Sequence, residues 1–284
     1  MDATLQRALA SAVERLLHGG VAEARLTAEV LLAHALGRER VYLFAHPEET
    51  LTPEAARIFR RAIGERLSGR PTQYITGSQE FYGRSFRVTP DVLIPRPETE
   101  HQVETVMRRQ PRARRIADIG CGSGAIGISL ALERPSYDLT LTDISPAALR
   151  VARENAATLG ANARFLCCDL GAALAPAAFD AVVSNPPYIP IEAREGLPRE
   201  VRDHEPHVAL FGSGQGNGIY RRLIADAERI LRPGGLLSFE IGYQDLDAVH
   251  PMFGPDWRFI EANQDLAGWP RVLSAFFHPG GAGL

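Results

Sequence analysis

The stretch RIADIGCGSGAIGISLALE, residues 115–133, decides the fold of this chain. It joins an apolar run typical of a buried strand to a glycine-rich loop and then to an apolar helix. Gly120, Gly122 and Gly124 lack side chains where a backbone turns sharply and approaches a ligand closely. The helix that follows points free N–H groups into the same space, which favours a carboxylate or phosphate there. A tight turn that binds nothing is the alternative interpretation.

The pattern around this stretch alternates between strand and helix. We expect helices at 124–134, 146–159 and 217–231, and strands at 115–119, 138–143, 163–168, 180–184, 235–241, 257–262 and 271–277. Such alternation predicts an α/β fold of the Rossmann type, with a mostly parallel seven-stranded sheet covered by helices on both faces. Ligands in this architecture bind at the carboxyl ends of the strands.

The first part of the chain has a different pattern. Residues 1–75 carry apolar side chains at helical spacing, which predicts a small helical bundle, and Thr52 before Pro53 predicts the start of one helix. Residues 76–94 have aromatic residues around a glycine and are interpreted as a β-hairpin linker to the domain at 95–284. The bundle is either a stability or oligomerisation module or a substrate-docking module, and its periodicity favours neither.

Carboxylates follow two of the predicted strands. Asp143 ends a strand at the place where nucleotide-binding folds bond ribose hydroxyls, whereas Ser145 before Pro146 is the better candidate for capping the next helix. Asp169 and Leu170 end the following strand. They can bond the adenine amine and cover its ring, or Asp169 can merely start a turn. NAD can use a similar glycine loop. The residues at the end of the fourth strand therefore have to distinguish an NAD site from other nucleotide sites.

That strand runs into Asn185-Pro186-Pro187-Tyr188. The prolines restrict the loop and lack N–H groups, so the loop is rigid and rich in acceptors. The Asn185 side-chain carbonyl and the Pro186 backbone carbonyl can accept both protons of an NH₂ group, while Tyr188 offers a flat face to a planar amide or base. A proline turn without a ligand is the alternative.

The chemistry expected of this loop is methyl transfer to nitrogen. An amide nitrogen is a poor nucleophile because its lone pair is delocalised. Acceptors on both N–H protons can aim that lone pair at a sulfonium methyl group, and positioning of this kind supplies about 7–11 kcal/mol. The proposal requires no metal and no nucleophilic His or Cys, and the acceptor of the released proton is unassigned.

Composition limits the other classes of function. The formal net charge is −3, which disfavours a non-specific DNA binder, and the three cysteines have no zinc-site spacing. The N-terminal residues lack the uninterrupted apolar run of a signal peptide, and no stretch approaches the length of a membrane span. We therefore expect a cytoplasmic protein that binds no membrane.

At this point the chain resembles the protein-(glutamine-N5) methyltransferases that modify peptide chain release factors, the PrmC/HemK family. The segment LIPRPETE at 93–100 and the segment EPHVALFG at 205–212 are the most specific parts of the resemblance. The remaining segments that carry it are AEVLLAHALG, DIGCGSGAIGISLA, TDISPAAL, SNPPYI, LLSFEIG and DLAGWPRVL. The resemblance covers nearly the whole chain.

The resemblance implies a class I methyltransferase that uses S-adenosylmethionine, releases S-adenosylhomocysteine and methylates the glutamine of the release-factor Gly-Gly-Gln loop. Its expected partners are class 1 release factors, with no stable nucleic-acid binding, and the chain is expected to be a monomer. Cofactor binding is expected at Gly120, Cys121, Gly122, Ser123, Gly124, Asp143, Asp169, Leu170 and Asn185. Substrate binding is expected at Asn185, Pro186, Pro187 and Tyr188, with Asn185, Pro186 and Tyr188 as the catalytic residues.

The sequence departs from the family pattern at two places. Leu170 stands where an aromatic residue is frequent, which weakens the expectation of adenine stacking, and Asn217 stands where an acidic residue is common. Other functions stay open: methylation of adenine in DNA or RNA, methylation of a ribosomal-protein glutamine, and a non-catalytic cofactor-binding regulator. Arginine clusters at 57–70 and 108–115 are interpreted as solvated helix faces or as surfaces that meet an acidic partner.

Overall fold

The computed structural model describes residues 4–212 and 217–280. The chain divides into two compact units, one of Met1–Gly77 with Pro198–His204 and the other of Ser78–Leu197 with Glu205–Leu284. The short segment at 198–204 lies in the part of the chain that the sequence assigned to the methyltransferase domain. It groups with the helical unit, where Glu200 forms an ion pair with Arg66.

The helical unit is the predicted bundle. Its helices are α1 (Leu5–His18), α2 (Ala24–Leu36), α3 (Arg40–Ala45), α4 (Pro53–Leu67), α5 (Thr72–Thr76) and α9 (Arg199–His204). The Thr52 side chain accepts a hydrogen bond from the Ala55 N–H and so caps α4, as predicted. Gly37 ends α2 in the left-handed conformation that favours glycine. Apolar side chains of α1, α2 and α4 form the core of this unit.

The second unit contains a two-stranded hairpin and a seven-stranded sheet. The hairpin consists of β1 (Ser78–Phe81) and β2 (Arg84–Arg87). The sheet consists of β3 (Arg115–Ile119), β4 (Asp138–Asp143), β5 (Ala163–Cys167), β6 (Phe179–Ser184), β7 (Leu231–Glu240), β8 (Trp257–Gln264) and β9 (Pro270–Phe277). Its order is β5-β4-β3-β6-β7-β9-β8, parallel as far as β7, with β9 antiparallel to both β7 and β8. This sheet confirms the predicted Rossmann-like fold.

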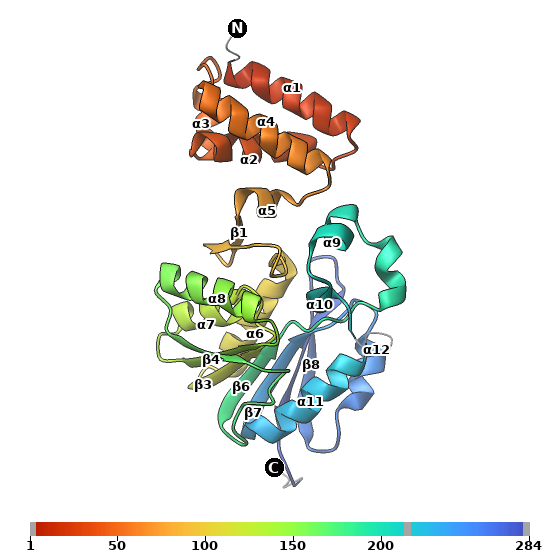
Figure 1. Ribbon diagram of the computed structural model, residues 1–284. Coiled ribbons are helices and arrows are strands. Elements are labelled where there is room, and N and C mark those ends of the chain that lie inside the picture. Colours follow the sequence, from red (N-terminus) through yellow and green to blue (C-terminus); the bar gives the residue numbers. More distant parts are fainter. Residues whose placement is uncertain (1–3, 213–216, 281–284) are drawn as a thin grey trace. The chain divides into compact units, whose positions relative to one another are not determined.

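Helices cover both faces of the sheet (Figure 1). One face packs against α6 (Glu100–Arg109), α7 (Ala125–Glu133) and α8 (Pro146–Leu159), and the other against α11 (Gly218–Ile230) and α12 (Leu246–Val249). Side chains alternate between the two cores, as strands require: Ile116 belongs to the first core and Ala117 to the second. The remaining short helices are η1 (Pro97–Thr99), η2 (Ile191–Gly196), α10 (His207–Leu210) and η3 (His250–Met252).

The strand register brings the sequence motifs to one edge of the sheet. Ile119 at the end of β3 pairs with Thr142 of β4 and with Ser184 of β6, so the glycine loop, Asp143 and Asn185 follow neighbouring strand ends. The chain passes from β3 to β4 on one side and returns to β6 on the other, which is the switch point where open α/β sheets bind ligands. Within the described residues, no helix has the length and apolar character needed to cross a membrane.

Candidate active site

A cavity of about 290 Å³ lies at this switch point. Its size is near the lower end of the range of about 300–1,000 Å³ that is usual for small-molecule sites. Three sets of residues make up most of its lining: the glycine loop with the start of α7, the ends of β4, β5 and β6, and the two segments at 91–95 and 208–212. Thr99, Ile219 and Arg222 line it as well. The last two segments overlap LIPRPETE and EPHVALFG, the most family-specific stretches of the sequence.

The glycine loop is held by backbone bonds to the end of β4. The N–H groups of Gly120 and Cys121 donate to the Thr142 carbonyl at 2.8 and 2.9 Å. Gly120 has a φ of +70° and Gly122 a φ of +54°, values that favour glycine. A Cβ atom built on either glycine meets no atom within 4 Å, so both glycines leave open space beside the cavity that they line.

Asp143 joins the glycine loop to the next helix. One carboxylate oxygen accepts the Gly122 N–H at 2.9 Å and the other accepts the Ser145 N–H at 2.8 Å. Burial raises the pKa of the Asp143 carboxyl. The Ser145 side chain caps α8 by accepting from the Ala148 N–H. This confirms the prediction that Ser145 is the residue that caps the helix.

Asp118 lies beneath the loop and is buried. Its Oδ2 atom accepts the Gly127 N–H at 2.9 Å, and its Oδ1 atom is buried without a hydrogen-bond partner in the part of the chain that the structure describes. Burial raises the pKa of this carboxyl to about 7, with the Asp143 charge adding to the effect. A Cβ atom on Gly127 would lie 2.8 Å from Asp118 Oδ2, so glycine is required where α7 passes this carboxylate.

Asp169 and Leu170 both line the cavity. The Asp169 carboxylate forms an ion pair with Arg222 of α11 at 2.5 Å, and its backbone carbonyl accepts from the Ala172 N–H in a turn. Leu170 has a φ of +47°, an uncommon conformation for a branched side chain. Arg222, which also lines the cavity, is a neighbour that the sequence alone did not identify.

The orientation of the Asn185 side chain is set by two acceptors. Its Nδ2 atom donates to Glu240 Oε2 at 3.0 Å and to Thr99 Oγ1 at 3.2 Å. Asn185 lines the cavity. Within the described residues, no protein donor bonds the Asn185 side-chain carbonyl or the Pro186 backbone carbonyl. The Asn185 side-chain carbonyl, on a residue that lines the cavity, is therefore available to a ligand.

Glu240 and Thr99 are site residues that the sequence analysis missed. Glu240 ends β7, is only 4% exposed, and accepts from the Thr99 hydroxyl at 2.6 Å and from the Tyr188 hydroxyl at 3.0 Å. Burial raises the pKa of both the Glu240 carboxyl and the Tyr188 hydroxyl. One signal was present in the sequence: a carboxylate directly after the apolar run LLSF at a predicted strand end.

The start of α6 supports the same loop. The Gln102 side chain, which is fully buried, donates from Nε2 to the Ser184 carbonyl at 2.7 Å, directly before Asn185. Upstream, Arg96 forms an ion pair with Glu205, whose second oxygen accepts the Ile94 N–H at 3.3 Å. Through Glu205, the last two bonds join the family-specific segments at 93–100 and 205–212 to each other.

Most of the predicted cofactor-binding and substrate-binding residues come together around the cavity, but three do not line it. Gly124 caps α7 with a φ of +81°, and a Cβ atom there would meet Ile128 at 2.6 Å, so its missing side chain makes room for internal packing. Pro186 is buried. Tyr188 packs against the apolar core on the α11 side of the sheet and bonds Glu240.

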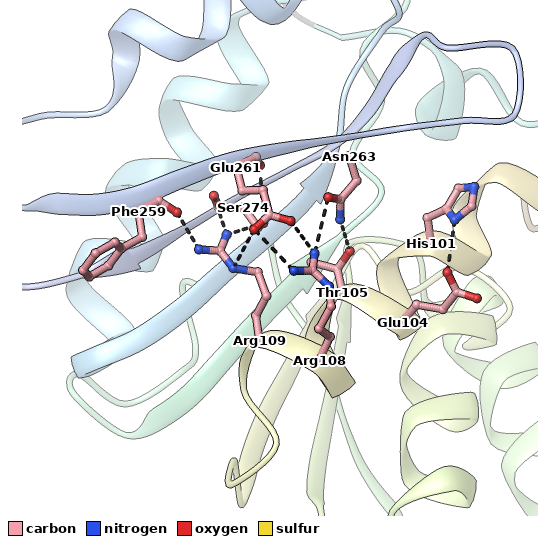
Figure 2. Close-up of polar contacts among 9 residues, drawn as sticks. All are labelled: His101, Glu104, Thr105, Arg108, Arg109, Phe259, Glu261, Asn263 and Ser274. Atoms are coloured by element: carbon pink, nitrogen blue, oxygen red, sulfur yellow. Dashed lines mark hydrogen bonds and ion pairs between the residues drawn. The ribbon is translucent and has the colours of Figure 1, made fainter.

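The arginine clusters are largely used inside the protein. Figure 2 shows Arg109 of α6 donating to Ser274 and to the Phe259 carbonyl, and Arg108 paired with Glu261. The first cluster forms ion pairs within the helical unit, namely Arg57–Glu54, Arg61–Glu65, Arg66–Glu200 and Arg70–Glu65. Solvated or internally paired helix faces therefore account for most of these side chains.

Among the residues described, no group of three or more His, Cys, Asp or Glu side chains is placed to hold a metal ion.

Two family models match the chain. One is described as PrmC N-terminal domain and matches residues 7–77, and the other as Methyltransferase small domain and matches residues 99–196. A release factor glutamine methyltransferase of Moorella thermoacetica is 51% identical over 279 residues, which cover 96% of this chain and 98% of the relative. One of Koribacter versatilis is 45% identical over 273 residues, with 95% and 97% covered.

The fold also matches solved structures. A methyltransferase from Pyrococcus furiosus aligns with a TM-score of 0.53 and 17% sequence identity, covering 70% of this chain and 91% of that chain. At such an identity the likeness shows the fold alone. The sequence relatives, which align over nearly their whole length, carry the argument about activity.

Proposed function

Because the chain belongs to the family of release factor glutamine methyltransferases, we propose that its cavity holds S-adenosylmethionine and that Asn185 and its neighbours bind the glutamine side chain to be methylated. The chain is a methyltransferase with a Rossmann-like fold, and its substrate is a glutamine of a release factor. We further propose that the methylated residue is the glutamine of the Gly-Gly-Gln loop.

The residues around the cavity fit this cofactor. Gly120 and Gly122 leave open space for close approach, and the start of α7 provides N–H groups that suit a carboxylate. In this proposal Asp143 accepts hydrogen bonds from the ribose hydroxyls, and Asp169, Leu170 and Arg222, which also line the cavity, hold the adenine ring. When bound, S-adenosylmethionine supplies an electrophilic methyl group.

The observation that carries the proposed substrate is the orientation of Asn185. With its Nδ2 atom donating to Glu240 and Thr99, this side chain presents only its carbonyl to the cavity. Together with the Pro186 carbonyl it makes a pair of acceptors, which suits an NH₂ group with two protons. The two carbonyls hold these protons and so direct the nitrogen lone pair, and positioning is the main contribution of the protein to the rate.

The helical unit is proposed as the part that docks the release factor, since methylation of a single loop requires contacts beyond one side chain. Methylation of adenine in nucleic acid is not favoured, because the full-length relatives named above are glutamine methyltransferases and most of the clustered arginines are paired within the protein. Methylation of a ribosomal-protein glutamine is not favoured either, because these relatives are release factor glutamine methyltransferases.

A methyl-transfer assay with four substrates tests the proposal. We expect purified protein with S-adenosylmethionine to add one methyl group to a class 1 release factor, and to add none to the same factor with the Gly-Gly-Gln glutamine replaced. Ribosomal protein and duplex DNA are the comparison substrates. Methylation of either of these, with no mass gain on the release factor, would contradict the proposed substrate.

A further inference from the structure

A single buried carboxylate organises the amide-binding loop. Three neutral donors converge on Glu240: the Thr99 hydroxyl at 2.6 Å, the Asn185 amide at 3.0 Å and the Tyr188 hydroxyl at 3.0 Å. We propose that Glu240 is a positioning residue, which fixes the flip state of Asn185 and the ring of Tyr188 so that the loop presents acceptors to its substrate. This inference rests on the proposed function.

An asparagine side-chain amide has two possible orientations. Its oxygen and nitrogen can exchange places by rotation, and the two states present opposite hydrogen-bonding groups to the cavity. A carboxylate can only accept, so the state with Nδ2 toward Glu240 gains a charge-assisted bond, whereas the flipped state would set the Asn185 oxygen against a negative charge. Glu240 thereby selects the state in which the carbonyl faces the cavity.

Thr99 strengthens the selection. Its hydroxyl donates to Glu240, so the proton of this hydroxyl is committed and only the oxygen lone pairs are left for Asn185. The Asn185 Nδ2 atom thus meets two acceptors, one on each of its protons. The Glu240 carboxylate is necessary for this arrangement, because it orients the threonine hydroxyl as well as the amide.

The surroundings of Glu240 contain few charges. The largest effect on the pKa of the Glu240 carboxyl is burial, which raises it. Arg271 lowers this pKa and Glu98 raises it. In the part of the chain that the structure describes, Glu240 forms no ion pair within 4.0 Å, so hydrogen bonds from neutral groups hold it. A buried carboxylate at a strand end without a cationic partner is costly, which argues for a role beyond packing.

The test compares Glu240→Met, which removes the acceptor at similar volume, with Glu240→Gln, which keeps one acceptor oxygen. Glu98→Met is the matched control, since Glu98 is a nearby exposed carboxylate. We expect kcat on the release factor to fall about ten- to hundredfold for Glu240→Met and less for Glu240→Gln. The Kd of S-adenosylhomocysteine should change by less than about twofold, because a positioning role acts on the methyl-transfer step.

Two results would overturn the inference while leaving the proposed function intact: an active parent with an equally active Glu240→Met variant, or a variant whose cofactor binding falls as much as its kcat. If the Glu240 variants do not fold, Thr99→Val and Thr99→Ser decide the question. The serine variant keeps the hydroxyl and should be about tenfold or more faster than the valine variant. Equal rates for these two would also contradict the inference. A parent that does not methylate the release factor at all would instead remove the proposed function.

Discussion

The backbone N–H of Gly127 donates to Asp118 Oδ2 at 2.9 Å, and this is the hydrogen bond that holds the buried carboxyl group under the glycine loop. Burial raises the pKa of Asp118 from 3.8 to about 7. Between about pH 4 and pH 7 the folded protein therefore keeps a proton that the unfolded chain has lost, so stability falls as the pH rises through this window.

Asp118→Asn should flatten this pH dependence. We expect the loss of unfolding free energy between pH 4 and pH 8 to shrink by up to about 4 kcal/mol in the variant, since one pKa unit corresponds to about 1.4 kcal/mol. The raised pKa values of Asp143 and Glu240 also make the stability fall as the pH rises, and this part of the pH dependence remains in the variant. Urea unfolding across this pH range is the measurement, with the exposed Asp247→Asn as control. A pH dependence unchanged from the parent would show that Asp118 is not the titrating group.

Gly124→Ala should destabilise the protein. The residue has a φ of +81°, and a Cβ atom would lie 2.6 Å from Ile128 Cδ1 and 3.2 Å from Leu141 Cδ2. Backbone strain and overpacking together cost about 1–3 kcal/mol. Gly254→Ala is the control in the same unit, because an added Cβ there meets nothing within 4 Å. Thermal unfolding of both variants decides: equal melting temperatures would contradict the packing argument.

Asp143→Asn should weaken cofactor binding. The variant keeps the shape of the side chain, but it replaces one of the two acceptor oxygens that bond the Gly122 and Ser145 N–H groups with an NH₂ group. We expect the Kd of S-adenosylhomocysteine to rise about ten- to hundredfold, from the loss of charge-assisted bonds to ribose and of order in the loop. Calorimetric titration measures it, and exposed Asp247→Asn should bind like the parent. An unchanged Kd would place the ribose elsewhere.

The parts of the site that follow from local pattern were predictable. Glycine spacing after an apolar run, a carboxylate at the next strand end and the Ser145 cap all depend on residues within one strand–loop–helix segment. The order of alternating elements then determines that these strand ends share one edge of the sheet. The helical bundle and its Thr52 cap were predictable for the same reason.

The Glu240 network was not predictable in this way. Thr99 and Glu240 are 141 positions apart, and Asn185 is 55 positions from Glu240. Only the pairing of β6 with β7 and the placement of η1 bring these three side chains together. The grouping of residues 198–204 with the helical unit was not predictable either. It involves tertiary contacts such as the ion pair between Glu200 and Arg66, which the local sequence does not indicate.

Asn185→Ala provides the most direct test of the acceptor pair. It removes the side-chain carbonyl that faces the cavity and also one of the three donors to Glu240. Loss of one preorganised group from a reaction site lowers kcat about 10²- to 10³-fold, and we expect an effect of this size on the release factor. Cofactor affinity should change far less than kcat, because the glycine loop and Asp143 do not depend on this side chain.

The exposed Asn162→Ala is the matched control for this variant and should methylate like the parent. Single-turnover methyl transfer with saturating cofactor separates the chemical step from binding. If Asn185→Ala kept the parent rate, the Pro186 carbonyl alone would have to hold the substrate amide. The oriented Asn185 carbonyl would then be a consequence of packing around Glu240 rather than the feature that directs the nitrogen lone pair.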